Sequence, residues 1–374
     1  MSLPAVQGGL SAELIDTIID YVASANRYHH MTRSLLSSCS LVCRTWLPRS
    51  RYHLFKAITL SSENHASFMR LITCPNCSFL GSIRRLTLIE TPDNDLGDLL
   101  LHQTLQTIDP SIFSNIKWLH IHNATFGFKS EEDFSKILSA LSRFTNITHL
   151  DLNKCIFHTL DNVILFLSSC GALESAHLNR VQLVEGPPLE VTPQSSLAQL
   201  PASLSSLIFT IGSGPSSILE IVPYAGSSLK HLSVSLTMNA VTTHVDILYR
   251  SSNLESIAFR IVSACRPNLV SHIPDVLQKL SSSSINEIAV SFWMNSVDAL
   301  DALDWISFTE ILSRENYKNL KRFTVLTTNV YLDVKAAKEW ITHKLRALAD
   351  KNPSLEIEFV RWRDPLEERR FGWS

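Results

Sequence analysis

The chain has 374 residues, 45% of them hydrophobic, which indicates one large domain or two unequal ones with a substantial core. A net charge of −2 without a basic stripe excludes the usual features of a nucleic-acid-binding protein. Seven scattered cysteines do not indicate a disulfide framework. Because neither a signal-peptide pattern nor a membrane-spanning apolar stretch is present, we expect a soluble protein of the cytoplasm or nucleus without membrane contact.

The first predicted elements are two short amphipathic helices within residues 10–60, followed by a third. Ser11 has a side chain suited to the N-cap of the first helix. Pro48 ends the second helix and can occupy the first turn of the third. Three helices in about 45 residues bury little surface, so we expect a partner or the following domain to cover them. The apolar stripes consist of Leu10, Leu14, Ile15, Ile18, Ile19 and Val22 in the first helix and Leu35, Leu36, Cys39, Val42, Cys43 and Trp46 in the second.

This N-terminal pattern, and above all Leu41-Val42-Cys43-Arg44-Thr45-Trp46, resembles an F-box. The resemblance implies a three-helix module that docks on the Skp-type adaptor of a cullin–RING ubiquitin ligase. Two departures from the family pattern are present: Ser11 stands where the family usually has proline, and the polar stretch 24–32 between the helices is long. They leave open that the helices only cap the following domain. The adaptor contacts that the resemblance implies are Leu10, Leu14, Ile15, Ile18, Val42 and Trp46.

From residue 83 onwards the template apolar-x-x-apolar-x-apolar occurs nine times. The first copy is Ile83-Arg84-Arg85-Leu86-Thr87-Leu88, and the fourth positions are residues 86, 119, 150, 176, 207, 232, 257, 288 and 323. Such spacing resembles leucine-rich repeats, in which each unit supplies a short strand and a return segment. One unit cannot bury its own apolar face, so neighbouring units stack. The predicted fold is therefore α/β: a helical module followed by a curved leucine-rich-repeat solenoid with a parallel sheet.

The segments between the repeats carry helical signals, and two further strands are expected at the edges of the sheet, at 58–60 and 355–359. Cys155 occupies the ninth repeat position, where the cysteine-containing subtype places a buried Asn or Cys. An ordinary α/β domain with parallel strands is the alternative, but it does not explain nine copies of one template. The helices are expected near 130–141, 160–167, 218–222, 245–249, 273–280, 305–312 and 334–349.

The third, fifth and seventh repeat positions are expected to line the concave face, because alternate side chains of a strand point to opposite sides. On the first strands these positions combine an aromatic ring, imidazoles and a carboxylate, whereas the middle strands carry small neutral side chains. An exposed Trp beside His and Arg is a typical interface anchor. A solvated polar face without a ligand is the alternative. The predicted substrate-binding residues are Trp118, His120, His122, His149, Asp151 and His177.

Sharper chemical motifs are incomplete, so we expect neither an enzyme nor a metal or cofactor site. Clustered histidines could suggest a metal, but surface histidines are common on such sheets. The pair Cys74 and Cys77 lacks a second pair of ligands, so two free thiols are expected. Segment 93–98 lacks the glycine and glutamate of a calcium loop, and 211–215 lacks the Lys-Ser/Thr of a phosphate loop.

Together these features predict three regions: an F-box-like module at 1–56, a leucine-rich-repeat solenoid at 57–360 and a charged, aromatic tail at 361–374. The tail is expected to cover the last repeat or to act as a partner-binding arm. By resemblance, the chain would be the substrate-recognition subunit of a Skp–cullin–F-box type ubiquitin ligase. The alternative is a repeat scaffold without adaptor binding. The identity of the protein substrate does not follow from the sequence.

Overall fold

The structure is a computed structural model that describes residues 10–25, 29–74, 77–90, 101, 103–104, 114–126, 131–184, 199–210, 217–236, 253–261, 272–292, 300–301, 304–327 and 333–361. Four predicted features lie wholly or mostly outside these residues: the helix at 245–249, the incomplete calcium motif, segment 211–215 and the tail beyond residue 361. No helix among the described residues has the length and apolar character needed to cross a membrane.

The N-terminal module consists of α1 (Ala12–Ala25), α2 (His29–Val42) and α3 (Leu47–Phe55). Ser11 caps α1 as predicted, since the backbone N–H of Leu14 donates to its Oγ at 3.3 Å. Two expectations were wrong. First, α1 continues to Ala25 and α2 begins at His29, so the stretch between the helices is shorter than 24–32.

Second, α2 ends at Val42 and does not extend to Trp46. The chain instead turns, with the backbone N–H of Trp46 donating to the Cys43 carbonyl at 3.2 Å, and Trp46 is the N-cap residue of α3. Pro48 lies in the first turn of α3, where its missing N–H costs nothing and its fixed φ suits a helix start. The proline therefore starts the third helix, and the chain direction changes several residues before it.

A small core holds the module together. Ile15, Ile19 and Leu36 are buried against one another, and half-buried Trp46 and Leu54 pack on them. On the surface between α1 and α3, the Asp20 carboxylate accepts two hydrogen bonds from Arg49, both at 2.6 Å. His53 Nε2 lies 2.7 Å from the same carboxylate. The Arg49 hydrogen bond lowers the pKa of Asp20 to about 2.

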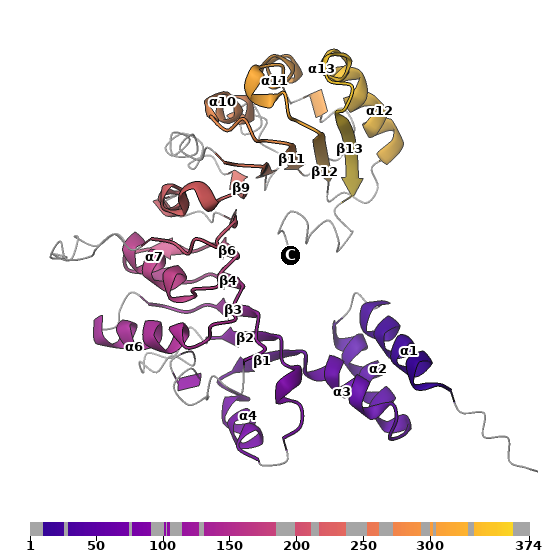
Figure 1. Ribbon diagram of the computed structural model, residues 1–374, viewed down its shortest axis with the longest axis vertical. Helices are drawn as coiled ribbons and strands as arrows, with labels where there is room; N and C mark the ends of the chain where they lie inside the picture. The colour runs from indigo at the N-terminus through magenta and orange to yellow at the C-terminus, as the bar shows by residue number, and fades with distance from the viewer. Residues whose placement is uncertain are drawn as a thin grey trace, which may run out of the picture.

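After the module, the described residues form a parallel sheet of eleven strands whose order follows the chain, as a solenoid requires (Figure 1). A second parallel sheet consists of the two short strands β5 (Ile156–Phe157) and β7 (Gln182–Leu183). The nine predicted strands and both predicted edge strands are confirmed. A doubly wound α/β domain would reverse its strand order, so this alternative is wrong. The strands are β1 (Ala57–Ser61), β2 (Arg85–Ile89), β3 (Trp118–His122), β4 (His149–Asn153), β6 (Ser175–Asn179), β8 (Ser206–Thr210), β9 (His231–Leu236), β10 (Ser256–Ile261), β11 (Glu287–Phe292), β12 (Arg322–Thr327) and β13 (Glu356–Arg361).

The return segments lie on the outer side of the arc that the sheet forms (Figure 1). Helices are confirmed near four predicted positions, at α6 (Glu131–Ser142), α7 (Leu160–Ser169), α10 (His272–Lys279) and α11 (Trp305–Leu312). The predicted helix at 218–222 is a 3₁₀ segment, η2 (Ser217–Ser228), which contains Pro223. The remaining elements are α4 (His65–Ile72), η1 (Leu80–Ser82), η4 (Glu315–Tyr317), α12 (Val334–Lys344) and α13 (Arg346–Lys351), the last two replacing the single helix expected at 334–349.

The strands align without offsets, so equivalent repeat positions pair across the sheet. Leu119 pairs with Leu150 and Leu150 with Ala176, all three at the fourth position and all buried. Cys155 is buried as its ninth position predicts, and its thiol donates to the Ile121 carbonyl at 3.5 Å. Burial raises the pKa of this thiol to about 12, so it remains protonated. The repeat period, the parallel sheet and the curvature are those of a leucine-rich-repeat solenoid.

Polar side chains at the repeat boundaries link neighbouring repeats. Asn146 Nδ2 donates to the Ser114 carbonyl at 2.5 Å, and Asn319 Nδ2 donates to the Ser283 carbonyl at 2.9 Å. Each asparagine stands directly before the first apolar position of its repeat. These bonds satisfy carbonyl groups that the return segments leave unpaired. The module joins the solenoid through a stack of Phe55 on Phe79, with ring centroids 4.2 Å apart.

Candidate functional site

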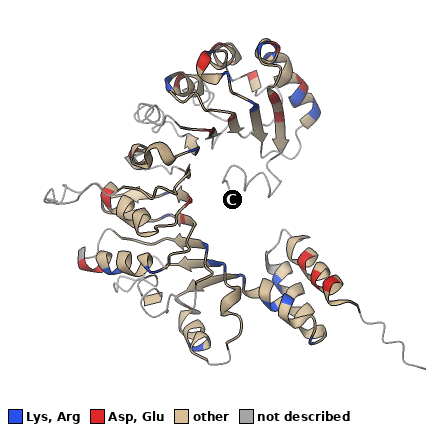
Figure 2. Ribbon diagram, in the orientation of Figure 1, with Lys and Arg blue, Asp and Glu red and all other residues tan. Residues whose placement is uncertain are grey.

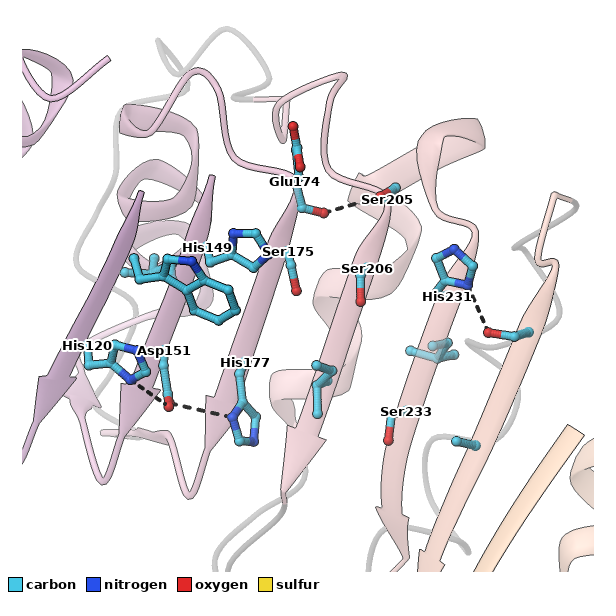
Figure 3. Close-up of a pocket in the computed structure, with 16 residues that line it drawn as sticks. His120, His149, Asp151, Glu174, Ser175, His177, Ser205, Ser206, His231 and Ser233 are labelled. Carbon is cyan, nitrogen blue, oxygen red and sulfur yellow. Dashed lines mark hydrogen bonds and ion pairs between the residues drawn. The ribbon is translucent and has the colours of Figure 1, made fainter. Parts of the chain in front are cut away.

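A pocket of about 450 Å³ opens on the concave face of the sheet between β3 and β10 (Figure 3). Five of the six predicted substrate-binding residues line it. His122 does not, because it lies at the seventh position, toward the end of β3, and is half-buried there. The lining residues are Trp118, His120, His149, Leu150, Asp151, Glu174, Ser175, His177, Ser205, Ser206, Ile208, His231, Leu232, Ser233, Ser256 and Ala258.

Trp118 is held between side chains from the two strands beside it. Its ring stacks on His149 of β4, with centroids 3.8 Å apart and planes inclined by 11°. The Arg85 guanidinium of β2 lies 5.1 Å from the centroid of the Trp118 ring. The register places these three residues side by side at the third repeat position. Trp118 is therefore half-buried between these neighbours, and it is not the exposed anchor that its sequence context indicated.

The Asp151 carboxylate lies between two imidazoles on the neighbouring strands. His120 Nδ1 is 3.1 Å from Asp151 Oδ2, and His177 Nδ1 is 3.6 Å from Asp151 Oδ1 (Figure 3). Burial acts to raise the pKa of Asp151, but the two imidazoles outweigh it and hold the pKa below its ordinary value. Because an ionised carboxylate only accepts hydrogen bonds, His120 Nδ1 is the donor to Asp151 Oδ2. The Asp151 carboxylate is thus stabilised by contacts within the pocket wall.

The middle of the pocket floor is made of small side chains. Ser175 of β6 and Ser206 of β8 pair in register, and they separate His149 on β4 from His231 on β9. The sequence pattern placed all of these residues on the concave face, but it did not identify the serines or His231 as part of a site. The sequence feature that could have identified them is a pair of serines between two histidines at the same position of four successive repeats. This feature becomes visible only when the repeats are aligned with one another.

Charged side chains are sparse in the pocket. The sixteen lining residues include the carboxylates Asp151 and Glu174 but no lysine or arginine. Lys230 at the rim is paired with Glu255, with Nζ and Oε1 2.9 Å apart. Ile208 and Ala258 of the lining belong to a small buried apolar cluster that continues away from the pocket through Ala289 to Leu326. The histidines of the pocket other than His231, and both of its carboxylates, lie on or beside β3, β4 and β6.

Arg322 carries most of the charge contacts at the opposite end of the concave face. It contacts Glu287 at 3.3 Å and Glu356 at 3.5 Å. Figure 2 shows that acidic and basic residues are distributed over both the helical module and the solenoid. Within the part of the chain that the structure describes, no group of three or more His, Cys, Asp or Glu side chains has the arrangement of a metal site. Cys74 and Cys77 are free thiols, as predicted.

The predicted adaptor contacts divide into exposed and internal residues. Leu10, Leu14 and Val42 are 52%, 46% and 61% exposed, and Ile18 is half-buried. Ile15, by contrast, is buried in the module core, so its assignment as a surface contact was wrong. Trp46 is half-buried and packs against the same core, which makes it chiefly a structural residue. Further exposed apolar residues of the module, which the sequence did not single out as contacts, are Tyr21, Met31, Leu35 and Leu41.

No protein-family model matches this sequence, and no curated protein sequence matches it either. Among solved structures, the leucine-rich-repeat-containing protein LegL7 from Legionella pneumophila aligns with a TM-score of 0.48 and 13% identity, covering 85% of this chain and 98% of that protein. A protein from Bacteroides fragilis gives a TM-score of 0.43 and 13% identity over 82% of this chain and 73% of its own. An internalin from Listeria monocytogenes aligns with a TM-score of 0.26 and 13% identity, covering 93% of each chain. At such low TM-scores and identities, these likenesses carry no conclusion about function.

Proposed function

We propose that this chain is the substrate-recognition subunit of a Skp–cullin–F-box type ubiquitin ligase. The observation that carries the proposal is the set of apolar side chains that the three-helix module leaves exposed. Leu14 and Val42 are among them, together with Leu41, which is 85% exposed. Large exposed apolar patches mark interaction sites in soluble proteins. In the chain's F-box-like segment, such a surface is where the Skp-type adaptor would bind.

In this proposal the two regions of the chain have separate tasks. The module binds the adaptor through Leu10, Leu14, Ile18 and Val42, and the adaptor connects it to a cullin–RING ligase. The solenoid binds a protein substrate in the concave pocket. The chain itself performs no chemistry, since ubiquitin transfer belongs to the other subunits, and it contributes proximity. The complex would act in the cytoplasm or nucleus.

A pull-down of the full-length chain with a Skp-type adaptor tests the proposal. Val42→Asp and Leu14→Asp place a charge on the exposed surface of the module, where a buried contact would not tolerate it. The matched control is Ile306→Asp, which alters a side chain that is 74% exposed on the solenoid helix α11. We expect adaptor capture to be lost in both module variants and kept in the control. Capture that survives both module variants would refute the adaptor role.

The second candidate function is a repeat scaffold without a ligase role. One observation favours it: the concave pocket is formed entirely by the sheet, from β3 to β10, and needs no residue of the module. Ser11, which caps α1 where the F-box pattern has proline, is also compatible with a module that serves only to cover the first repeat. Failure of the wild-type chain to capture any Skp-type adaptor, together with retained partner binding by the solenoid, would support this candidate.

A further inference from the structure

Four register-aligned side chains cross the floor of the concave pocket. His149, Ser175, Ser206 and His231 pair in sequence on the neighbouring strands β4, β6, β8 and β9 (Figure 3). We call these four residues the hydrogen-bonding row. Because neighbouring strands lie about 4.8 Å apart, the row spans about 14 Å across the strands. It forms the base of a shallow slot with an imidazole at each end.

Each member of the row offers an unused hydrogen-bonding group. Among the described residues, the hydroxyls of Ser175 and Ser206 have no partner. The two imidazoles use only Nδ1: that of His149 lies 2.8 Å from the Thr148 hydroxyl, and that of His231 lies 2.9 Å from the Ser256 hydroxyl. Both Nε2 atoms are left for a ligand. Hydroxyls and imidazoles can donate as well as accept, which matches the alternating N–H and C=O groups of a peptide.

The charges around the row disfavour a phosphorylated ligand. Phosphoryl groups are usually bound by arginine and lysine, and no such side chain lines the pocket. Burial lowers the pKa of His149, so this imidazole is neutral near neutral pH. Asp151 contacts His120 and His177, whereas Glu174 adds a carboxylate at the rim that contacts neither of them. A phosphate would therefore approach the Glu174 carboxylate without a lysine or arginine in the lining to offset the repulsion.

We propose that the hydrogen-bonding row binds an extended, unphosphorylated peptide segment of the substrate, about four residues long. The inference rests on the proposed function, because it names the class of ligand that the substrate pocket accepts. An extended chain covers roughly 3.3–3.6 Å per residue, so about four residues match the length of the row. The row binds the backbone and side-chain amides of this segment, and the edge of Trp118 borders it at the N-terminal end of the slot.

The experiment uses the full-length chain and two libraries of short randomised peptides, one unmodified and one with a central phosphoserine. Binders selected on the wild-type chain are then measured against the double variant Ser175→Ala/Ser206→Ala. The matched control is Thr87→Ala, which removes a hydroxyl from the same concave face on β2, outside the pocket. We expect binders from the unmodified library, a loss of at least about tenfold in affinity in the double variant, and no change in the control.

Hydrogen–deuterium exchange of the wild-type chain gives a second readout that does not depend on the variants. A bound peptide should protect β4, β6, β8 and β9, and protection confined to other elements would overturn the proposal. Three further results would overturn it: binders from the phosphoserine library alone, no binder from either library, or equal affinity for the wild-type chain and the double variant.

The same preparations separate this inference from the ligase role. If adaptor capture is intact but the unmodified peptides do not bind the row, the inference fails and the adaptor role stands. If the peptides bind the row and adaptor capture is absent, the ligand class stands and the solenoid is the recognition domain of a scaffold.

Discussion

The helical module and the solenoid differ sharply in how they bury their apolar side chains. Among the module residues that the structure describes, Ile15, Ile19 and Leu36 are the only apolar ones that form a buried cluster. In the solenoid a single core runs from Ile58 on β1 to Phe359 on β13. Each repeat covers its neighbour, whereas three short helices have little interior to share. The difference indicates that a three-helix module of this size leaves apolar side chains exposed.

The same contrast appears in two carboxylates that each contact two basic side chains. Asp20 in the module has a side chain that is 43% exposed, between Arg49 and His53. Asp151 in the solenoid is 18% exposed, between His120 and His177. Solvent and salt screen the first cluster much more than the second. The contacts of the Asp151 carboxylate should therefore stabilise the solenoid more than the contacts of the Asp20 carboxylate stabilise the module.

The largest expected effect is in the solenoid core. Leu150 on β4 is 2% exposed and lies at the fourth repeat position, between Leu119 and Ala176. Leu150→Ala should lower the free energy of unfolding by about 2–5 kcal/mol, because it leaves a cavity that the aligned strands cannot close. Chemical denaturation followed by circular dichroism measures this change. Ile306→Ala, at an exposed position, is the control and should change stability by less than about 0.5 kcal/mol.

A somewhat smaller and local effect is expected in the module. Ile19 is completely buried, but its cluster contains few other residues. Ile19→Ala should increase amide hydrogen exchange throughout α1, α2 and α3, while the amides of the sheet keep their protection. The reason is that α3 joins the solenoid mainly through the Phe55–Phe79 stack. Equal loss of protection in β4 and β6 would show instead that the two regions unfold together.

The two carboxylates provide a comparison that depends on pH. Asp151→Asn should lower the free energy of unfolding by about 1.5–3 kcal/mol near neutral pH, because it removes a charged acceptor from two imidazoles. An unfolded aspartate has a pKa of about 3.9, and the folded pKa of Asp151 is lower. Its contribution is therefore fully present above about pH 4 and is lost as the pH falls through the folded pKa. Denaturation of Asp151→Asn and wild type at a series of pH values should show the difference shrinking in acid.

Asp20→Asn is the matched variant in the module. Although hydrogen bonds from Arg49 lower the pKa of Asp20 to about 2, its exposure leaves less than about 1 kcal/mol of stabilisation. The difference in unfolding free energy between Asp20→Asn and wild type should also become smaller when salt is added. The corresponding difference for Asp151→Asn should not change with salt. A larger cost for Asp20→Asn than for Asp151→Asn would contradict the contrast between the two regions.

Much of this fold was predictable because its information is local and repeated. On β2, β3, β4 and β6 the third, fourth and fifth repeat positions alternate in burial as the period of a strand requires, so Leu119, His120 and Leu150 were placed correctly. From β8 to β12 the fifth position is buried as well, which the alternation did not predict. The module was less predictable. A helical stripe that includes Val42 and Trp46 does not reveal that the chain turns between them, since apolar residues on both sides of a turn can keep a helical spacing.

The pocket was predictable as a region but not in its details. Five residues were identified because the first strands carry polar and aromatic side chains on the concave face, whereas the later strands carry small ones. These five residues line one pocket. The covered faces of Trp118 could not be predicted, because they depend on which strands are neighbours and on side-chain packing across them. Ser175 and Ser206 carry no signal of their own: their position between His149 and His231 gives them significance.

An effect of similar, small size is expected for the asparagines that link the repeats. Asn146 and Asn319 each donate to a carbonyl of the preceding repeat, at 2.5 and 2.9 Å. Replacing either with alanine should cost about 0.5–1.5 kcal/mol, the net value of one hydrogen bond. Because many repeats separate the two sites, the double variant should show the sum of the single costs. Denaturation of the three variants measures this additivity. A double variant that loses much more than the sum would mean that strain at one boundary spreads along the solenoid, rather than remaining between neighbouring repeats.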